Sequence, residues 1–413
     1  MNLSKKIRIM IICLALITIS ACSSCRMFEG FPVLNTESSV NAEPDESYAK
    51  TESKAVSDNS SKTASKSYTD VCYKHLTSDE KQVFDELRNG LLSFKTDIKF
   101  SKPVVSVDDY HLFYKAVVNS IPNEDFLDEN SNYLYNDDNK ITDVKPKYKC
   151  TKEQFEKKNK TLYAAADKVV ANAKNYTAYD KIRYFHDYLI KKCTYTVTGA
   201  DIYSAYGCLV NGKAVCEGYS KAFSILCQRA GIASVLVSGT ATNNQGNTEG
   251  HMWNKVLFGK AWYNVDVTWD DMPGISKAVA SYDYYFVNDE GFKANHTVEK
   301  NRFVKYPSAS SMKANYYVRN KLYVSGDQDP VELFKTAAGQ AVKNQSELIT
   351  LKFKDLKQLE SVYDYINADN STFGDLLATR CHDYNAVIDF KNVSYATNNA
   401  MKIITVRIPF IKQ

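Results

Sequence analysis

Residues 251–269 read HMWNKVLFGKAWYNVDVTW, two runs of β-branched and aromatic residues separated by Gly259 and Lys260. Such runs favour strands, and a two-residue connection that contains glycine favours a tight hairpin. With this turn, Phe258 pairs with Ala261 and His251 lies opposite Thr268. The preceding run, IASVLVSG at 232–239, predicts another strand. The fold therefore has to include an antiparallel sheet.

The chain ahead of these strands is predicted to be mostly helical, which makes the fold class α+β. Capping boxes mark two helix starts, because a threonine is followed three residues later by glutamate or glutamine and then by apolar residues at helical spacing. Helices are expected from Thr77, over 107–120, from Thr151 and from Thr177. His186 belongs to the apolar face of the last of these helices and is interpreted as a core residue.

Residues 301–413 predict a separate small α+β module. YYVRNKLYV at 316–324 favours a hairpin, whereas LITLKF and MKIITVRIPF favour strands. Helices are expected over 330–342 and 355–366. The role of this module stays open.

The first residues indicate export. Basic residues at positions 5, 6 and 8 precede an apolar run over 9–19, which is typical of a signal peptide at 1–21. The run ends in Ile-Ser-Ala-Cys, which resembles the bacterial lipobox and implies a lipid on Cys22. Residues 22–70 contain few large apolar side chains and predict a flexible tether. We therefore expect a lipid-anchored, extracytoplasmic protein on a bacterial cell membrane; an ordinary signal with a coincidental cysteine is the alternative.

Net charge gives no reason to expect a nucleic-acid partner. The formal charge of +4 is the small difference between 52 basic and 48 acidic residues. Cys22 and Cys25 have the spacing of half a zinc site, but no second ligand pair accompanies them. We expect no metal and no cofactor.

Cys216, in VNGKAVCEGYSKAF, is predicted to open a buried helix that stops at Gly231. A helix N-terminus favours thiolate over thiol, but by only about 0.3–1 kcal/mol at an ordinary site. Half ionisation of a thiol at neutral pH requires about 2 kcal/mol. A second basic group is therefore needed, and a histidine is the natural candidate.

His251, oriented by Asp266, is the candidate for that basic group. The two residues lie on the same face of the predicted hairpin, directly opposite or one diagonal step apart, so the carboxylate can orient the imidazole. Cys216, His251 and Asp266 are thus the expected catalytic triad. The adjacent acids Asp270 and Asp271 are interpreted as a solvated strand end or turn rather than a cation site. Core packing is the expected role of Trp253, Trp262 and Trp269, with one of them as an alternative wall of the cleft.

The motifs GKAVCEGYSKAF, GHMWNKV and WYNVDVTWDD resemble the three core motifs of the transglutaminase-like superfamily, the papain-related cysteine acyltransferases and peptidases. The order Cys, His, Asp matches, with separations of 35 (251 minus 216) and 15 (266 minus 251) residues. The resemblance spans 177–297, with weaker similarity back to Leu76, so residues 71–300 are taken as the domain. It also places His296 along the cleft, without a chemical role.

The resemblance implies that the Cys216 thiolate attacks a glutamine or peptide amide carbonyl and forms a thioester. His251 acts as base and acid, Asp266 orients it, and the Cys216 backbone N–H serves as an oxyanion donor. The partner is then a protein or peptide substrate, and a cell-wall peptide is one candidate. A lysine amine as acceptor makes a transglutaminase, whereas water makes a peptidase or deamidase. The alternative from another class is a non-catalytic cell-surface binding module.

Overall fold

A computed structural model describes residues 72–128, 131–271, 280–368 and 372–411. The chain divides into two compact units, with the division between Ala314 and Asn315. The sequence prediction divides the chain after residue 300; residues 301–314 pack with the first unit, where the ring of Phe303 lies 5.1 Å from that of Phe113. The predicted signal peptide, the lipidation at Cys22 and the tether lie outside the described residues.

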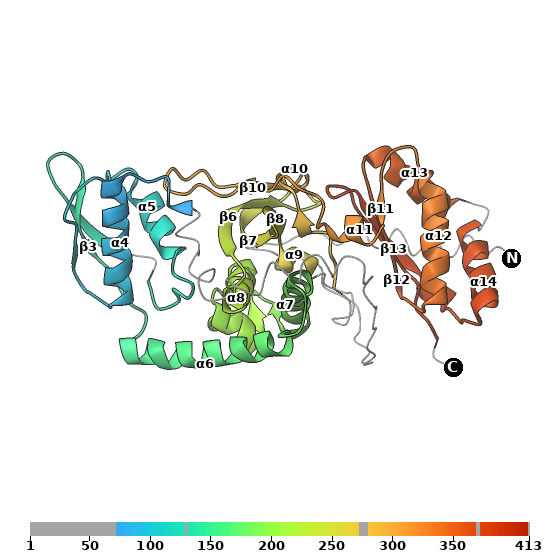
Figure 1. Cartoon of the computed structure of the whole chain (residues 1–413), viewed down its shortest axis with the longest axis horizontal. Coiled ribbons are helices and arrows are strands. Elements are labelled where there is room, and N and C mark those ends of the chain that lie inside the picture. The colour runs from blue at the N-terminus through green and yellow to red at the C-terminus, as the bar shows by residue number, and fades with distance from the viewer. Residues whose placement is uncertain (1–71, 129–130, 272–279, 369–371, 412–413) are drawn as a thin grey trace. The chain divides into compact units, whose positions relative to one another are not determined.

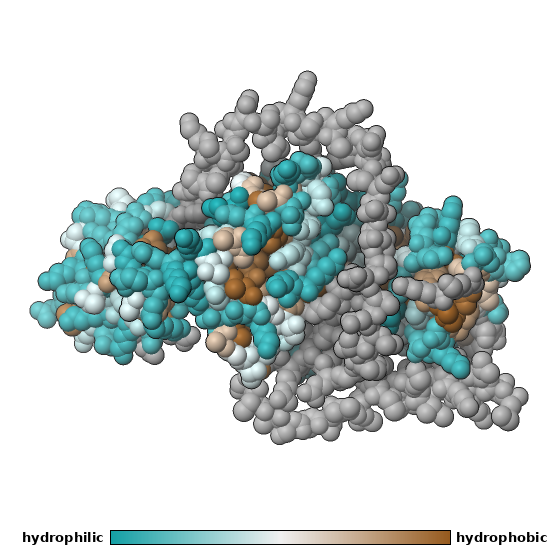
Figure 2. Space-filling model, turned by 90° about the horizontal axis from the view of Figure 1, so that it is seen from below, coloured by the Kyte–Doolittle hydropathy of each residue, from teal (hydrophilic) through white to brown (hydrophobic). Residues whose placement is uncertain are grey.

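The first part of the first unit has its own apolar core. Thr77 caps α4 (Ser78–Leu92) through the predicted capping box with Glu80. Its buried face packs with α5 (Tyr110–Val118) and with a small sheet of order β1-β3-β2. The strands are β1 (Ile98–Lys99), β2 (Asn132–Tyr135) and β3 (Ile141–Lys145), none of which was predicted from the sequence. Figure 2 shows that the face of this part seen from below is mostly hydrophilic.

Three helices carry the chain to the main sheet. The predicted starts at Thr151 and Thr177 are confirmed, because these side chains cap α6 (Lys152–Asn172) and α7 (Ala178–Lys192). The predicted helix α8 (Cys216–Arg229) is buried along most of its length. Gly231 ends it at a φ of 74°, with Ile232 N–H donating to the Cys227 carbonyl oxygen, a Schellman cap.

The main sheet of the first unit has the order β10-β6-β7-β8-β9, and every pairing in it is antiparallel. In Figure 1, α7 and α8 lie below β6, β7 and β8, and α6 runs below these helices. The predicted α+β class is therefore confirmed. The strands are β6 (Ser234–Thr242), β7 (Thr248–Phe258), β8 (Ala261–Val265), β9 (Tyr285–Val287) and β10 (His296–Val298).

The hairpin turn follows the prediction, whereas the return strand does not. Phe258 pairs with Ala261, and Gly259 has the positive φ of 60° that a tight turn needs. The strand ends at Val265, however, and the pairing of His251 with Thr268 is not formed. The expected strand through Trp269 was wrong because the chain turns into the short helix α9 (Val267–Asp270), which the Asp266 side chain caps.

The second unit is an α+β module, as predicted. Its sheet has the order β11-β12-β14-β13, and three helices share its apolar core. The expected hairpin at 316–324 was wrong: its first half is α11 (Tyr316–Arg319), and its second half, β11 (Tyr323–Val324), pairs in parallel with β12. The remaining elements are α12 (Pro330–Lys343), β12 (Leu348–Phe353), α13 (Leu356–Asn367), α14 (Thr372–Tyr384), β13 (Ser394–Asn398) and β14 (Ile403–Arg407). Among the helices of the described residues, none is long and apolar enough to cross a membrane.

Candidate active site

Cys216 is the first residue of α8. Val215 before it is extended and has no side-chain oxygen that could cap the helix. The thiol therefore lies where the first backbone N–H groups of a helix point outward and carry partial positive charge. Among the cysteines that the structure describes, Cys216 and Cys150 are the two that are not fully buried.

Position 218, in the first turn of α8, has room only for glycine. A Cβ at this position would lie 2.7 Å from the Ile202 carbonyl oxygen and 2.9 Å from that of Ser204. Val215 N–H also donates to the Ile202 carbonyl oxygen at 2.9 Å. The backbone of 202–204 is thus packed directly against the turn that carries the nucleophile, which fixes the position of that turn.

A buried cation anchors the same helix. Lys221 donates to Glu124, to Glu217 at 2.5 Å and to the Tyr203 carbonyl oxygen at 3.0 Å. Burial opposes its charge, but the two carboxylates raise the pKa of Lys221 above its usual range. Because Glu124 precedes the β2–β3 sheet, this contact ties the first part of the unit to the helix of the site.

His251 on β7 lies between the thiol and a carboxylate. Its Nε2 is 2.6 Å from Asp266 Oδ2, and its ring also interacts with Cys216, for which Nδ1 remains. Burial opposes the charge of the ring, but the charge and hydrogen bond of Asp266, together with Cys216, raise the pKa of His251 to about 10. The imidazole is therefore held as a cation at neutral pH, which is the form that stabilises a thiolate.

Asp266 is fully buried and accepts four hydrogen bonds. Oδ1 accepts from the backbone N–H groups of Thr268 and Trp269 at 3.0 and 3.1 Å, and Oδ2 faces His251 and His296. Burial alone would raise the pKa of Asp266, but the two histidines lower it well below its usual range. The cap of α9 thus orients the carboxylate. The diagonal pairing across a regular hairpin, which was expected from the sequence, does not orient it.

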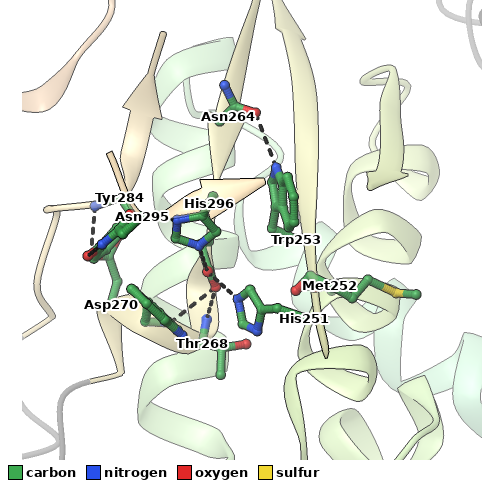
Figure 3. Close-up of polar contacts among 12 residues, drawn as sticks. His251, Met252, Trp253, Asn264, Thr268, Asp270, Tyr284, Asn295 and His296 are labelled. Atoms are coloured by element: carbon green, nitrogen blue, oxygen red, sulfur yellow. Dashed lines mark hydrogen bonds and ion pairs between the residues drawn. The ribbon is translucent and has the colours of Figure 1, made fainter. Parts of the chain in front are cut away.

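His296 is the contact that sequence reasoning missed. It begins β10, and its Nε2 lies 3.1 Å from the same Asp266 oxygen that contacts His251; both rings point to that atom in Figure 3. Burial, together with the His251 charge, lowers the pKa of His296 to about 4 despite the contact with Asp266. No residue spacing could have revealed this pair, because β10 joins the sheet at the edge beyond β6.

The two acids after Trp269 were interpreted wrongly as a solvated strand end, because both are buried. Asp270 Oδ2 lies 3.0 Å from Nε2 of His186, and Asp271 accepts the Tyr219 hydroxyl hydrogen at 2.6 Å. The predicted burial of His186 is confirmed, and its other ring nitrogen contacts Asp187 at 2.9 Å. These contacts fasten α9 to α7 and α8.

The tryptophans divide between the core and the site. Trp253 is buried and donates from its indole N–H to Asn264 at 3.2 Å. Trp269 is partly buried, with its ring 5.6 Å from that of His251 and 4.7 Å from that of His296. It therefore forms one wall around the two imidazoles.

His251, Asp266 and His296 offer three ligand-type atoms within 4.8 Å of one another. Two ligands at about 2.0–2.2 Å from one tetrahedral zinc ion stand about 3.3 Å apart. The separation of 2.6 Å between His251 Nε2 and Asp266 Oδ2 is shorter than that and fits a hydrogen bond. As they stand, these residues do not form a zinc site.

A family model of the transglutaminase-like superfamily matches residues 163–267. A solved structure of a TGase covers 45% of this chain and 53% of its own length at 15% identity, with a TM-score of 0.26. A candidate cysteine protease from Cytophaga hutchinsonii covers 34% of this chain and 61% of its own length at 12% identity, with a TM-score of 0.23. This chain thus spans less than two thirds of either protein, and no curated protein matches it.

The matched residues include Cys216, His251 and Asp266. Residues 163–267 form a transglutaminase-like superfamily domain.

Proposed function

We propose that this domain catalyses thiol-dependent acyl transfer or hydrolysis at amide bonds of peptides or proteins. The supporting observation is the His251 imidazole, which contacts Cys216 on one side and lies 2.6 Å from the buried Asp266 carboxylate on the other. A thiol that is merely buried needs neither a cationic imidazole nor a carboxylate behind it.

In the proposed reaction, the Cys216 thiolate attacks the amide carbonyl carbon, and the carbonyl oxygen takes up the negative charge. The Cys216 backbone N–H, free of an intrahelical acceptor at a first helical position, donates to this oxyanion. The His251 imidazolium then protonates the leaving nitrogen, the C–N bond breaks, and a thioester remains. An amine or water, deprotonated by His251, attacks the thioester and releases the thiolate.

The acceptor separates the candidate activities. An amine gives a transglutaminase, and water gives a peptidase or a deamidase. To decide, the full chain is incubated with a glutamine-containing peptide library with and without a primary amine, and the products are read by mass spectrometry. Amine incorporation indicates transfer, new termini indicate proteolysis, and conversion of glutamine to glutamate indicates deamidation.

The controls are Cys216→Ser, which should abolish every product, and Cys150→Ser, which removes the other partly exposed thiol among the described residues and should change none. If the peptides stay untouched with the unaltered chain, the non-catalytic binding module is favoured instead.

We further propose, from the sequence of the first 22 residues, that the chain is exported and anchored by a lipid on Cys22, so that a surface protein or a cell-wall peptide is the substrate. Incorporation of a fatty-acid analogue into the full chain, and its loss in Cys22→Ser, tests the anchor. Label that persists in Cys22→Ser would contradict the attachment residue.

A further inference from the structure

Two histidines share one carboxylate oxygen in this site, whereas the proposed chemistry uses only one of them. His251 approaches Asp266 Oδ2 at 2.6 Å from β7, and His296 approaches it at 3.1 Å from β10. The other carboxylate oxygen is occupied by the cap of α9. His296 therefore completes the hydrogen bonding of a buried anion.

The surroundings of His296 favour a neutral ring. It is 3% exposed, and the ring of Phe292 packs against it at 4.1 Å. The titratable groups that face it are Asp266, His251 and the Tyr284 ring at 5.4 Å. A second imidazolium would lie beside that of His251 with one carboxylate between them, which is unfavourable in a buried site. The lowered pKa of His296 also favours the neutral ring.

A neutral His296 that donates to Asp266 from Nε2 has a lone pair on Nδ1. Nδ1 lies 2.8 Å from the side-chain oxygen of Asn295, and the side-chain NH2 of Asn295 donates to the Tyr284 hydroxyl at 2.8 Å (Figure 3). This orientation requires a hydrogen on Nδ1. The neutral ring requires the amide turned by 180°, with its N–H toward Nδ1 and its oxygen toward the Tyr284 hydroxyl, which can donate as well as accept. With the amide turned in this way, Asn295 and Tyr284 hold the Nε2–H tautomer of His296.

We propose that His296 is a positioning residue: its neutral Nε2–H donates to Asp266, fixes the carboxylate against His251 and limits how tightly the carboxylate holds the His251 proton. The proposal deepens the proposed function, since it concerns the same acid and base. His251 has to release its proton to the leaving nitrogen, and a carboxylate with a further donor is a weaker base. Without that donor, His251 becomes a poorer acid.

The first test is the pH dependence of Cys216 alkylation by iodoacetate, followed site by site by mass spectrometry. The imidazolium attracts this anionic reagent, so the rate falls when His251 loses its proton. In His296→Phe, which keeps an aromatic ring but has no donor, we expect this fall to move about one pH unit higher. Turnover of the amide substrate should drop about tenfold in kcat with KM unchanged.

Two further variants separate positioning from packing. His296→Gln keeps a donor at the reach of Nε2 and should restore the unaltered profile, whereas Phe292→Leu loosens the same packing and should not move it. If His296→Phe fails to fold, His296→Asn, whose amide is too short to reach the carboxylate, replaces it. The proposal is overturned if the fall in alkylation rate at high pH stays at the same pH in His296→Phe. It is also overturned if this fall moves equally in Phe292→Leu.

The second test does not depend on activity. Nitrogen-15 NMR of the full chain carrying Cys216→Ser should show His296 neutral at about pH 7 with its hydrogen on Nε2. A doubly protonated ring, or a hydrogen on Nδ1 alone, overturns the proposal. If Cys216 of the unaltered chain shows no enhanced alkylation while the NMR result holds, it is the proposed function that fails, and His296 is then a donor to a structural carboxylate.

Discussion

At the scale of single residues, the site depends on one carboxylate that serves three elements. Asp266 caps α9, orients the imidazole on β7 and accepts from the imidazole on β10. The cap uses Oδ1 and both imidazoles use Oδ2 of the same side chain, so the position of His251 and the start of α9 are set together. A change at Asp266 should therefore affect both chemistry and local structure.

We expect Asp266→Asn to lower kcat/KM by at least about 10²-fold, because an uncharged amide neither stabilises the imidazolium nor fixes its tautomer. The amide oxygen can still cap α9, so the fold should survive. Removal of the carboxylate also lowers the pKa of His251 from about 10, and the alkaline limb of iodoacetate labelling should move to lower pH. This shift is opposite in sign to the one expected for His296→Phe. Labelling that is unchanged in Asp266→Asn would contradict the proposed arrangement.

At the scale of elements, the sequence predicted the helix caps and the turn that depend only on neighbouring residues. The caps at Thr77, Thr151 and Thr177 and the turn at Gly259 were all visible in the sequence, because each depends on residues within a few positions. The short helix α9 was not visible, because VDVTW alternates like a strand. The helix begins here because the Asp266 side chain accepts hydrogen bonds from two backbone N–H groups.

Long-range pairing explains the other misses. Residues 316–324 alternate like a hairpin, yet their second half pairs with β12 instead of with their first half. His296 contacts Asp266 only because β10 joins the sheet beside β6, where His296 pairs with Ala241. In the candidate site, the order and spacing of Cys216, His251 and Asp266 were therefore readable, whereas the fourth member required the strand order.

The contacts that hold α9 make a prediction about stability and pH. Contacts with Asp187 and Asp270 outweigh burial and raise the pKa of His186 to about 9. Its stabilisation is complete below its ordinary value near 6.5 and is lost as the pH rises through about 9.

The first unit should therefore be more stable near pH 6 than near pH 9. The double variant His186→Gln, Asp270→Asn keeps a hydrogen-bonding pair without charges and should show a smaller fall in the free energy of unfolding, measured with urea at each pH. His382→Gln, at an exposed position of α14, is the control and should keep the full fall. An equal fall in the double variant would show that these two groups do not cause it.

At the scale of the whole chain, the two units bury different sets of apolar residues. The second unit buries its own set, which includes Phe334, Leu351 and Ile404, and the helix of Cys216 buries another, which includes Phe223 and Leu226. A unit with its own core can unfold without the other. The chemistry of Cys216 should then be insensitive to the stability of residues 315–413.

Phe334→Ala tests this independence, because Phe334 is fully buried and its truncation should cost about 3–5 kcal/mol. Hydrogen exchange followed by mass spectrometry should show faster exchange within 315–413, while amides of 72–314 and the rate of Cys216 alkylation stay unchanged. Leu226→Ala, a buried truncation in α8, is the matched control and should have the reverse pattern. If Phe334→Ala also slows alkylation, the second unit stabilises the site, and removal of residues 315–413 should then lower activity as well.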